Sequence, residues 1–386
     1  MQKAITKQKK LIVVALAAAA FSAPALAETG NVSIYGVADL SYDFINNGTS
    51  AAGVAGASKS NVSSNISKLG FKGAESLSDG LSAIWQIEQQ INIDNSAAAT
   101  ALASRNSFLG LKSDSFGTVL LGRHDTPYKL STRKLDPFND SIADGRALLS
   151  VVAGKSAGYS FDGRQADSVY YTTPVMSGFT GLIAYANLNE AAATTPVPGT
   201  ATGKNSLFSL AGMYNVAPFF GSFAYEEHKL ETFRADGKES AWKLGLGYTL
   251  NAFTLGFSYE KSNDSLGASS VANVGAACNG KTAGSECFGH NAYLLSGVYK
   301  MDMNAINFTY GKLGQTGTIA NTGANQIGLG YDYGLSKRTK LYAIYSRISN
   351  KSASSYGFSQ STAAAGTING VGASPSVVSL GIKHSF

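Results

Sequence analysis

Apolar and polar residues alternate along much of this chain. In the last twelve residues, "PSVVSLGIKHSF", the positions Val378, Leu380, Ile382 and Phe386 share one parity, and small or polar residues dominate the other. Successive side chains of a β-strand point to opposite faces, so this segment is expected to be a strand with one apolar and one wet face. Terminal residues order only when something holds them, and here the pattern persists to the final phenylalanine. The strand is therefore expected to be fixed at its very end.

The same period of two recurs in segments spread over the whole chain. Clear examples are residues 31–44, 81–94, 240–250 and 253–262. Seven short, turn-like connections alternate with eight longer polar stretches. The longer stretches are expected to be loops, at 46–64, 95–103, 127–162, 188–204, 229–239, 262–290, 314–324 and 350–373. Short turns on one side and long loops on the other are typical of an outer-membrane barrel.

The count of connections predicts an all-β fold, a 16-stranded antiparallel transmembrane β-barrel with short periplasmic turns and long extracellular loops. A sheet in hydrocarbon cannot keep an unpaired edge, so the last strand is expected to pair with the segment beginning "NVSIYGVADL". A terminal Phe386 would then lie in the aromatic girdle at the membrane boundary.

The N-terminal segment indicates export. "MQKAITKQKK" carries four lysines, an apolar run follows from Leu11 to Phe21, and "ALA" at 25–27 is a small-x-small cleavage signal. The apolar run is well short of the roughly 20 residues that a membrane-spanning helix needs. We therefore expect residues 1–27 to be a signal peptide, cleaved after Ala27, and residues 28–386 to be the barrel domain.

Cleavage changes the charge balance. The chain has 31 basic and 25 acidic residues, and removal of the four lysines leaves 27 minus 25, a net charge of +2. Such a small excess does not favour nucleic acid as a partner. Charged residues make up only 15% of the chain, whereas it contains 43 glycines, 19 tyrosines and 19 phenylalanines. This composition suits a sheet with a continuous apolar outer surface.

Two cysteines, Cys278 and Cys287, stand in the polar segment "CNGKTAGSEC". In an exported protein, a pair this close indicates a disulfide within one loop. A metal site would require more ligands than two thiols. No metal and no cofactor are therefore expected.

The segment 275–282, "GAACNGKT", matches the phosphate-binding pattern G-x-x-x-x-G-K-[ST]. That chemistry requires a helix after the lysine, and the "AGSECFGH" that follows is a poor helix former, so we interpret the match as chance. The four histidines are scattered, and no serine or cysteine stands in a nucleophile turn with a partner base. An enzymatic function is not expected.

Six segments spread over the chain carry a family resemblance. They are "VSIYGVADLSYDF", "SKLGFKGAESLSDGLSAIWQIE", "RNSFLGLKSDSFGTVLLGRHDTP", "DSVYYTTPVMSGF", "YGLSKRTKLYAIYS" and "VSLGIKHSF". Together they resemble the general porins of Gram-negative bacteria, in particular those of neisserial and other β-proteobacterial outer membranes. The resemblance implies a homotrimer of 16-stranded channels, each with its third loop folded into the lumen. It also implies that the barrel-assembly machinery reads the strand ending at Phe386.

The resemblance further implies which residues narrow the pore. The segment after "GRHDTPY" corresponds to the inward loop, and "KLDPFNDSIADGRALL" within it contains three anions, Asp136, Asp140 and Asp144. The wall cations that face this loop in the family correspond here to Lys68, Arg105 and Arg123.

The alternation and one departure from the family refine this picture. Lys68 and Lys72 share a parity opposite to Leu69 and Phe71, so both are expected to face water in the lumen. Like charges at a low-dielectric constriction sort ions by sign. Strongly anion-selective members often carry an arginine where this chain has Tyr170, so we expect a weak anion preference.

We therefore predict a passive general diffusion porin that passes ions and small hydrophilic solutes. Two alternatives keep the barrel: a porin with a preferred substrate, and a non-conducting barrel that acts as an adhesin or an enzyme. A large substrate-specific transporter would need more strands than this chain can supply, and a plug domain in addition. The expected partners are outer-membrane lipids, two further copies of the chain, the assembly machinery and the permeating solutes.

Overall fold

The described part of the chain comprises eight segments. The computed structural model describes residues 32–94, 102–149, 161–188, 205–230, 238–263, 289–317, 319–358 and 370–386. The predicted signal peptide and the predicted disulfide between Cys278 and Cys287 lie outside these segments.

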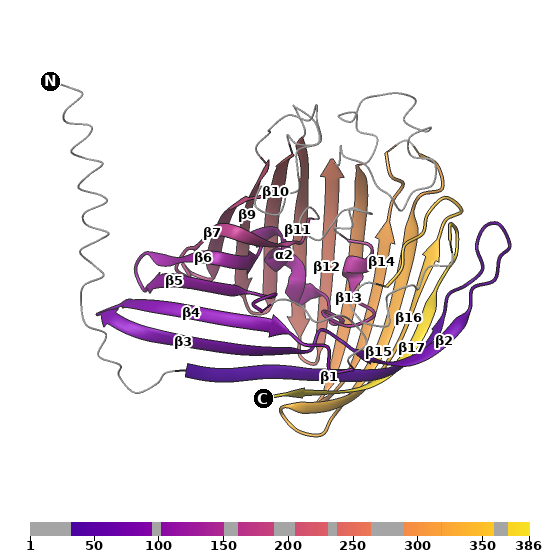
Figure 1. Ribbon diagram of the computed structural model, residues 1–386, viewed down its shortest axis with the longest axis horizontal. Coiled ribbons are helices and arrows are strands. Elements are labelled where there is room, and N and C mark those ends of the chain that lie inside the picture. The colour runs from indigo at the N-terminus through magenta and orange to yellow at the C-terminus, as the bar shows by residue number, and fades with distance from the viewer. Residues whose placement is uncertain are drawn as a thin grey trace. The chain divides into compact units, whose positions relative to one another are not determined.

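The described residues form one antiparallel sheet of 17 strand segments (Figure 1). The segments are β1 (Val32–Asn46), β2 (Ser58–Ser64), β3 (Lys68–Ser78), β4 (Leu81–Gln90), β5 (Ser107–Ser113), β6 (Gly117–Asp125), β7 (Arg164–Thr172), β8 (Phe179–Asn187), β9 (Asn205–Val216), β10 (Phe219–Leu230), β11 (Lys238–Leu250), β12 (Phe253–Asn263), β13 (His290–Met301), β14 (Asn304–Leu313), β15 (Ala324–Gly334), β16 (Thr339–Asn350) and β17 (Ser376–Ser385).

β2 and β3 are two parts of one barrel strand. Both pair with β1, and they are separated only by residues 65–67, where Ile66 has a positive φ of 52°. A left-handed residue breaks the regular ladder because its backbone cannot continue the extended geometry. Counted this way, the described sheet is a closed barrel of 16 strands, which confirms the predicted fold.

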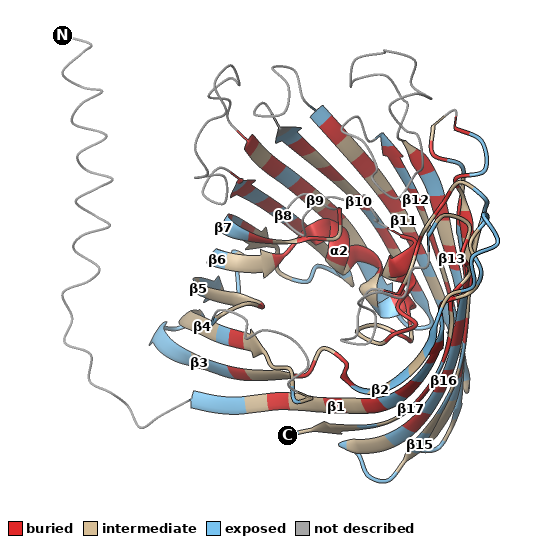
Figure 2. Ribbon diagram, turned by 45° about the vertical axis from the view of Figure 1, so that its right-hand side comes forward, coloured by how far each residue is buried: buried red, intermediate tan, exposed pale blue. Residues whose placement is uncertain are grey.

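The barrel closes between its first and last strands. β1 pairs with β17 in a register that runs from Val37 opposite Ser385 to Asn46 opposite Ser376. The backbone N–H of Phe386 donates to the carbonyl of Gly36 at 3.1 Å, and the N–H of Gly36 donates back at 3.0 Å. The expected pairing of the last strand with the N-terminal strand is thus confirmed, and Figure 2 shows β1, β17 and β2 side by side.

The two faces of the wall differ as the alternation requires. On β1, Tyr42 and Phe44 are 44% and 50% exposed on the outer face. Asp39, Ser41 and Asp43 alternate with them and are buried on the inner face. An apolar outside and a polar inside are what a barrel needs when lipid surrounds it and water fills it.

Two strand boundaries differ from those predicted. The segment 46–64 was expected to be a loop. Ser58–Ser64 instead forms β2, because its backbone pairs with the C-terminal half of β1. The alternating segment 81–94 is a strand only to Gln90, where β4 ends. The alternation of apolar and polar residues reveals a strand only when one of its faces is apolar. It therefore misses a strand that is polar on both faces.

A loop enters the barrel between β6 and β7. It contains α2 (Pro127–Thr132), η1 (Arg133–Leu135) and η2 (Gly145–Ala147), which lie inside the ring of strands in Figure 1. Thr126 caps α2, and Pro127 fits its first turn because the missing N–H has no partner there anyway. Within the described segments, no helix is long and apolar enough to cross a membrane.

Glycines on the wall make room for this loop. A Cβ added at Gly330 would lie 2.6 Å from the ring of Phe138, and one at Gly247 would lie 3.1 Å from Leu135. Both distances are closer than ordinary side-chain packing allows. The loop is therefore seated directly on the backbone of the facing wall.

Candidate functional site

A carboxylate on the wall contacts two of the predicted wall cations. Glu88, on β4, accepts from Arg105 Nε at 2.6 Å and lies 3.8 Å from Lys68 Nζ. The hydroxyl of Tyr35 donates to the same carboxylate at 3.0 Å. Lys68 begins β3 and Arg105 lies just before β5, so three adjacent strands bring these charges to one height in the lumen.

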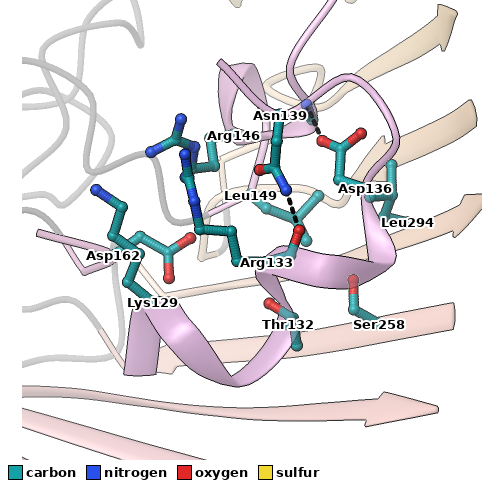
Figure 3. Close-up of a pocket in the computed structure, with 11 residues that line it drawn as sticks. Lys129, Thr132, Arg133, Asp136, Asn139, Arg146, Leu149, Asp162, Ser258 and Leu294 are labelled. Carbon is teal, nitrogen blue, oxygen red and sulfur yellow. Dashed lines mark hydrogen bonds between the residues drawn. The ribbon is translucent and has the colours of Figure 1, made fainter. Parts of the chain in front are cut away.

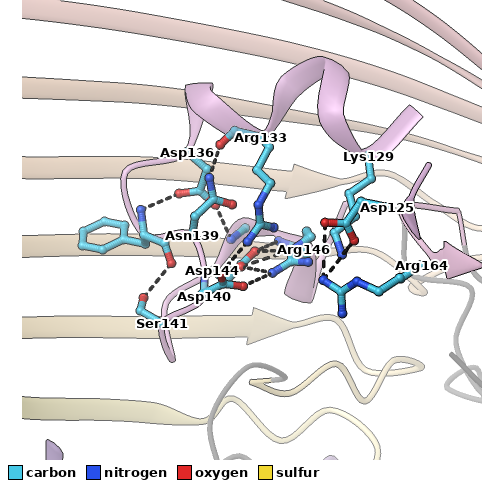
Figure 4. A network of polar contacts seen from close by, with 12 residues as sticks. Asp125, Lys129, Arg133, Asp136, Asn139, Asp140, Ser141, Asp144, Arg146 and Arg164 are labelled. Carbon is cyan, nitrogen blue, oxygen red and sulfur yellow. Dashed lines mark hydrogen bonds and ion pairs between the residues drawn. The ribbon is translucent and has the colours of Figure 1, made fainter. Parts of the chain in front are cut away.

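Asp140 connects the inward loop to this wall cluster. Its carboxylate lies 2.6 Å from Arg133 Nη2 and 3.2 Å from Arg146 Nη2, both on the loop itself. Arg105 Nη2 approaches it from the wall at 3.9 Å. Figure 4 shows Asp140 between the two loop arginines. The predicted wall cation Arg105 and the predicted loop anion Asp140 therefore meet.

The other two predicted loop anions stabilise the loop. Asp136 accepts from the backbone N–H groups of Gly145, at 2.7 Å, and Phe138, at 2.8 Å, which ties the two ends of the loop tip together. Asp144 accepts from the backbone of Arg146 at the start of η2 and binds its guanidinium at 2.6 Å. Figure 3 shows the carboxylate of Asp136 hydrogen-bonded to the backbone of the loop.

The surroundings of the loop carboxylates set their charge. Burial alone would raise the pKa of Asp140, but Arg133 and Arg146 together outweigh burial and hold this pKa well below its usual range. Burial raises the pKa of Asp136, and the nearby Asp144 raises it further. Asp140 is therefore the loop carboxylate that stays ionised in the pore, whereas the charge of Asp136 depends on pH.

Two predicted wall cations lie outside the ion-pair network. Arg123, on β6, donates from Nε to the carbonyl of Ser104 at 3.2 Å. Lys72 is exposed, with Nζ 5.1 Å from the centre of the Tyr35 ring. Both side chains remain available to attract anions, but neither contacts the loop.

A second ion cluster lies at the start of the loop. Asp125, at the end of β6, binds Lys129 Nζ at 2.8 Å and Arg164 Nη2 at 3.0 Å. Burial lowers the pKa of Lys129 to about 8, although Asp125 opposes this effect. Tyr170, on the neighbouring β7, is buried and carries no charge into this cluster.

Sequence reasoning did not assign six of these charged residues: Glu88, Asp125, Lys129, Arg133, Arg146 and Arg164. Glu88 and Arg164 could have been found, because both stand on strands at the polar parity beside predicted cations. Arg133 and Arg146 belong to the predicted loop, but their positions depend on its fold, which has no period to follow.

Behind the loop, fully buried charges anchor it to the opposite wall. Lys243 Nζ, on β11, lies 2.6 Å from Asp162 and 3.5 Å from Glu260. The hydroxyl of Tyr128, on α2, donates to Glu260 at 2.8 Å. The cavity between loop and wall measures only about 20 Å³ (Figure 3), room for about one water molecule.

Positive charge is in excess around the loop. The network through Glu88 and Asp140 joins four cations to three carboxylates, namely Lys68, Arg105, Arg133 and Arg146 to Glu88, Asp140 and Asp144. The second cluster adds two cations to one carboxylate. Among the described residues that these ion pairs join, each cluster thus contains one more cation than carboxylates. The described residues contain no group of three or more His, Cys, Asp or Glu side chains placed to hold a metal ion.

A closed antiparallel barrel with an apolar exterior, a polar lumen and a charged inward loop defines a membrane channel protein. The family profile described as Gram-negative porin matches residues 14–353. The chain belongs to this family, and it is a porin of the Gram-negative outer membrane. This family and fold point to a channel that catalyses no reaction.

Individual relatives agree with this assignment. Outer membrane porin protein 32 of Delftia acidovorans is 27% identical over 382 residues, which cover 98% of this chain and 100% of that protein. The major outer membrane protein P.IB of Neisseria sicca is 30% identical over 71% of this chain and 75% of its own length.

Solved structures share the fold. The anion-selective porin from Comamonas acidovorans has a TM-score of 0.69 at 23% identity, covering 92% of this chain and 99% of its own. The trimer form of OmpT from Vibrio cholerae has a TM-score of 0.63 at 15% identity, covering 93% of this chain and all of its own.

Proposed function

We propose that this porin is a general diffusion channel with a weak anion preference, set where the inward loop meets the wall. The observation that carries this proposal is Arg105, which lies between Glu88 on the wall and Asp140 on the loop. An anion that passes there meets guanidinium and ammonium groups in excess over carboxylates. Charges of one sign in a narrow, low-dielectric passage raise the local concentration of counter-ions.

The preference is weak because each carboxylate in the cluster offsets a cation. Glu88 and Asp140 each contact more than one basic side chain, so only one positive charge per cluster remains. The proposed wall cations are Lys68, Lys72, Arg105 and Arg123, and the proposed pore anion is Asp140. We assign Asp136 and Asp144 mainly to the shape of the loop.

The assembly is also a proposal. We propose a homotrimer in outer-membrane lipid, exported with a signal peptide cleaved after Ala27 and inserted by the barrel-assembly machinery. A trimer form is named for OmpT of Vibrio cholerae, which shares this fold. Exposed leucines on β5 and β6, Leu109, Leu111 and Leu121, suit a contact between subunits as well as lipid.

Conductance in a planar bilayer under a salt gradient tests the proposed function. We expect stepwise insertions that close in thirds and a reversal potential of weak anion preference. Replacing Lys68, Arg105 and Arg123 together by methionine should move the reversal potential towards cations. An unchanged reversal potential in this triple variant would overturn the constriction assignment, and no conductance from a folded barrel would favour an adhesive or enzymatic role.

A further inference from the structure

A buried aspartate on the closure seam of the barrel has no partner. Asp43 lies on β1 at an inward position and is fully buried. Neither of its carboxylate oxygens accepts a hydrogen bond, and it makes no ion pair with any described residue. A buried, ionised carboxylate without partners is strongly unfavourable, so something must compensate it.

The neighbours of Asp43 add further oxygen atoms. Asn61 on β2 and Ser379 on β17 lie directly opposite Asp43 in the two ladders of β1. Directly opposite side chains in antiparallel strands have Cβ atoms about 5 Å apart, so the three form one short row on the inner wall. The Oδ1 of Asn61 and the Oγ of Ser379 are likewise buried without a hydrogen-bond partner.

No hydrogen-bond donor in the row meets this need. The amide nitrogen of Asn61 already donates to Ser63 Oγ at 3.0 Å and to the carbonyl of Val62 at 3.2 Å. Lys59 lies opposite Ile45, one inward position farther along β2 and outside this row. The hydroxyl of Ser379 donates to neither carboxylate oxygen of Asp43.

The inward loop covers the surroundings of this row. Ile344, opposite Ser379 on β16, packs with Phe138 and Ala143 of the loop. Ile45, the next inward residue after Asp43, packs in the same apolar cluster as Ile142. The oxygen atoms are thus enclosed between the seam of the barrel and the loop tip, away from the open lumen.

We propose that Asp43, Asn61 and Ser379 form a binding site for a hard cation, Ca²⁺ or Na⁺. Carboxylate, amide and hydroxyl oxygens are the ligands that such ions prefer. All four oxygens could coordinate one cation at the same time. One carboxylate among neutral ligands corresponds to weak binding, with a Kd for Ca²⁺ on the order of 10⁻⁴–10⁻³ M. The bound ion would join β2, β1 and β17 beneath the constriction loop.

Cation titration of the purified trimer tests the site. The protein should be refolded without lipopolysaccharide, washed with a chelator and titrated with CaCl₂ by calorimetry. We expect one Ca²⁺ per protomer, with affinity at least about tenfold weaker in Asp43→Asn because the only charged ligand is lost. The matched control is Asp332→Asn, an inner-wall aspartate on β15 that is already paired with Lys340 at 2.7 Å. It should bind Ca²⁺ like the wild type.

A second arm separates the two ions and covers a variant that does not fold. Thermal unfolding of the wild type and of Ser379→Ala is compared in NaCl and in choline chloride of equal ionic strength. Stabilisation by Na⁺ alone, weaker in Ser379→Ala, identifies Na⁺ as the occupant and supports the site. If neither Ca²⁺ nor Na⁺ binds or stabilises the wild type, the proposal is overturned.

Discussion

At the scale of single residues, we expect Glu88 to limit the anion preference of the pore. Its carboxylate compensates Arg105 directly and Lys68 more weakly. Replacing Glu88 by glutamine keeps the size of the side chain and removes one negative charge. A unit charge at about 4 Å in water contributes roughly 1 kcal/mol, so we expect anion permeability to rise and cation permeability to fall, each by up to about fivefold.

The reversal potential in a salt gradient measures this change. Asp332→Asn is the matched control, because it also removes one lumenal carboxylate, but one that pairs with Lys340 on β16. Equal shifts in both variants would mean that the net charge of the lumen, and not the constriction, sets selectivity.

We expect Lys129 to make ion selectivity depend on pH in the alkaline range. Burial lowers the pKa of this lysine to about 8, so it is charged at neutral pH and loses its proton as pH rises through that value. When Lys129 is neutral, Asp125 still pairs with Arg164. We expect Lys129→Met to reduce anion preference at pH 6–7 and to have no effect above about pH 9.

Reversal potentials of the wild type and of Lys129→Met, measured between pH 6 and about 10, provide the test. The difference between the two proteins separates the effect of Lys129 from that of other titrating groups. Lys337→Met, at the turn between β15 and β16, controls for charge lost far from the loop. A difference that stays constant over this range would contradict the lowered pKa.

Part of the site could be predicted from the sequence because it follows strand parity and a family resemblance. Strand parity predicted that Lys68 faces the lumen, and the family resemblance pointed to Arg105 and Asp140, which lie 3.9 Å apart. The roles of Asp136 and Asp144 could not be predicted in this way. They depend on backbone contacts within an irregular loop, which no periodicity encodes.

At the scale of elements, the inward loop is held by its fit to wall glycines. Phe138 packs against Gly330, where an added Cβ would lie 2.6 Å from its ring. Gly330→Ala should therefore push Phe138 off the wall, at a cost of about 1–3 kcal/mol for overpacking. We expect a more mobile loop, seen as a noisier open-channel current and faster proteolysis of the loop in folded trimers.

The control for this variant is Gly221→Ala on β10, because a Cβ there meets nothing within 4 Å. It should leave current noise and proteolysis unchanged. Identical behaviour of the two variants would show that alanine in a strand, and not contact with Phe138, causes any effect.

The strands themselves were predictable to the extent that one face is apolar. β11 and β12 match the expected segments within two residues, because outward leucines and aromatics alternate with small or polar residues. β2, with the sequence "SKSNVSS", has no such face, and its strand conformation comes from the ladder to β1. The pairing with β1, and not the local sequence pattern, determines the conformation of that segment.

At the scale of the whole molecule, one residue completes the ring. Phe386 exchanges two backbone hydrogen bonds with Gly36, and its ring occupies the space where a Cβ of residue 36 would stand. Deleting Phe386 removes two bonds worth about 1 kcal/mol each and an apolar group at the membrane boundary, while the constriction stays untouched. We therefore expect less folded barrel in the outer membrane, with unchanged conductance per inserted channel. Heat-modifiable mobility in gels measures the folded amount, and Phe386→Tyr, which keeps both bonds and the ring, should assemble normally. A deletion variant that assembles fully but conducts differently would mean that the end of β17 acts on the pore and not on closure.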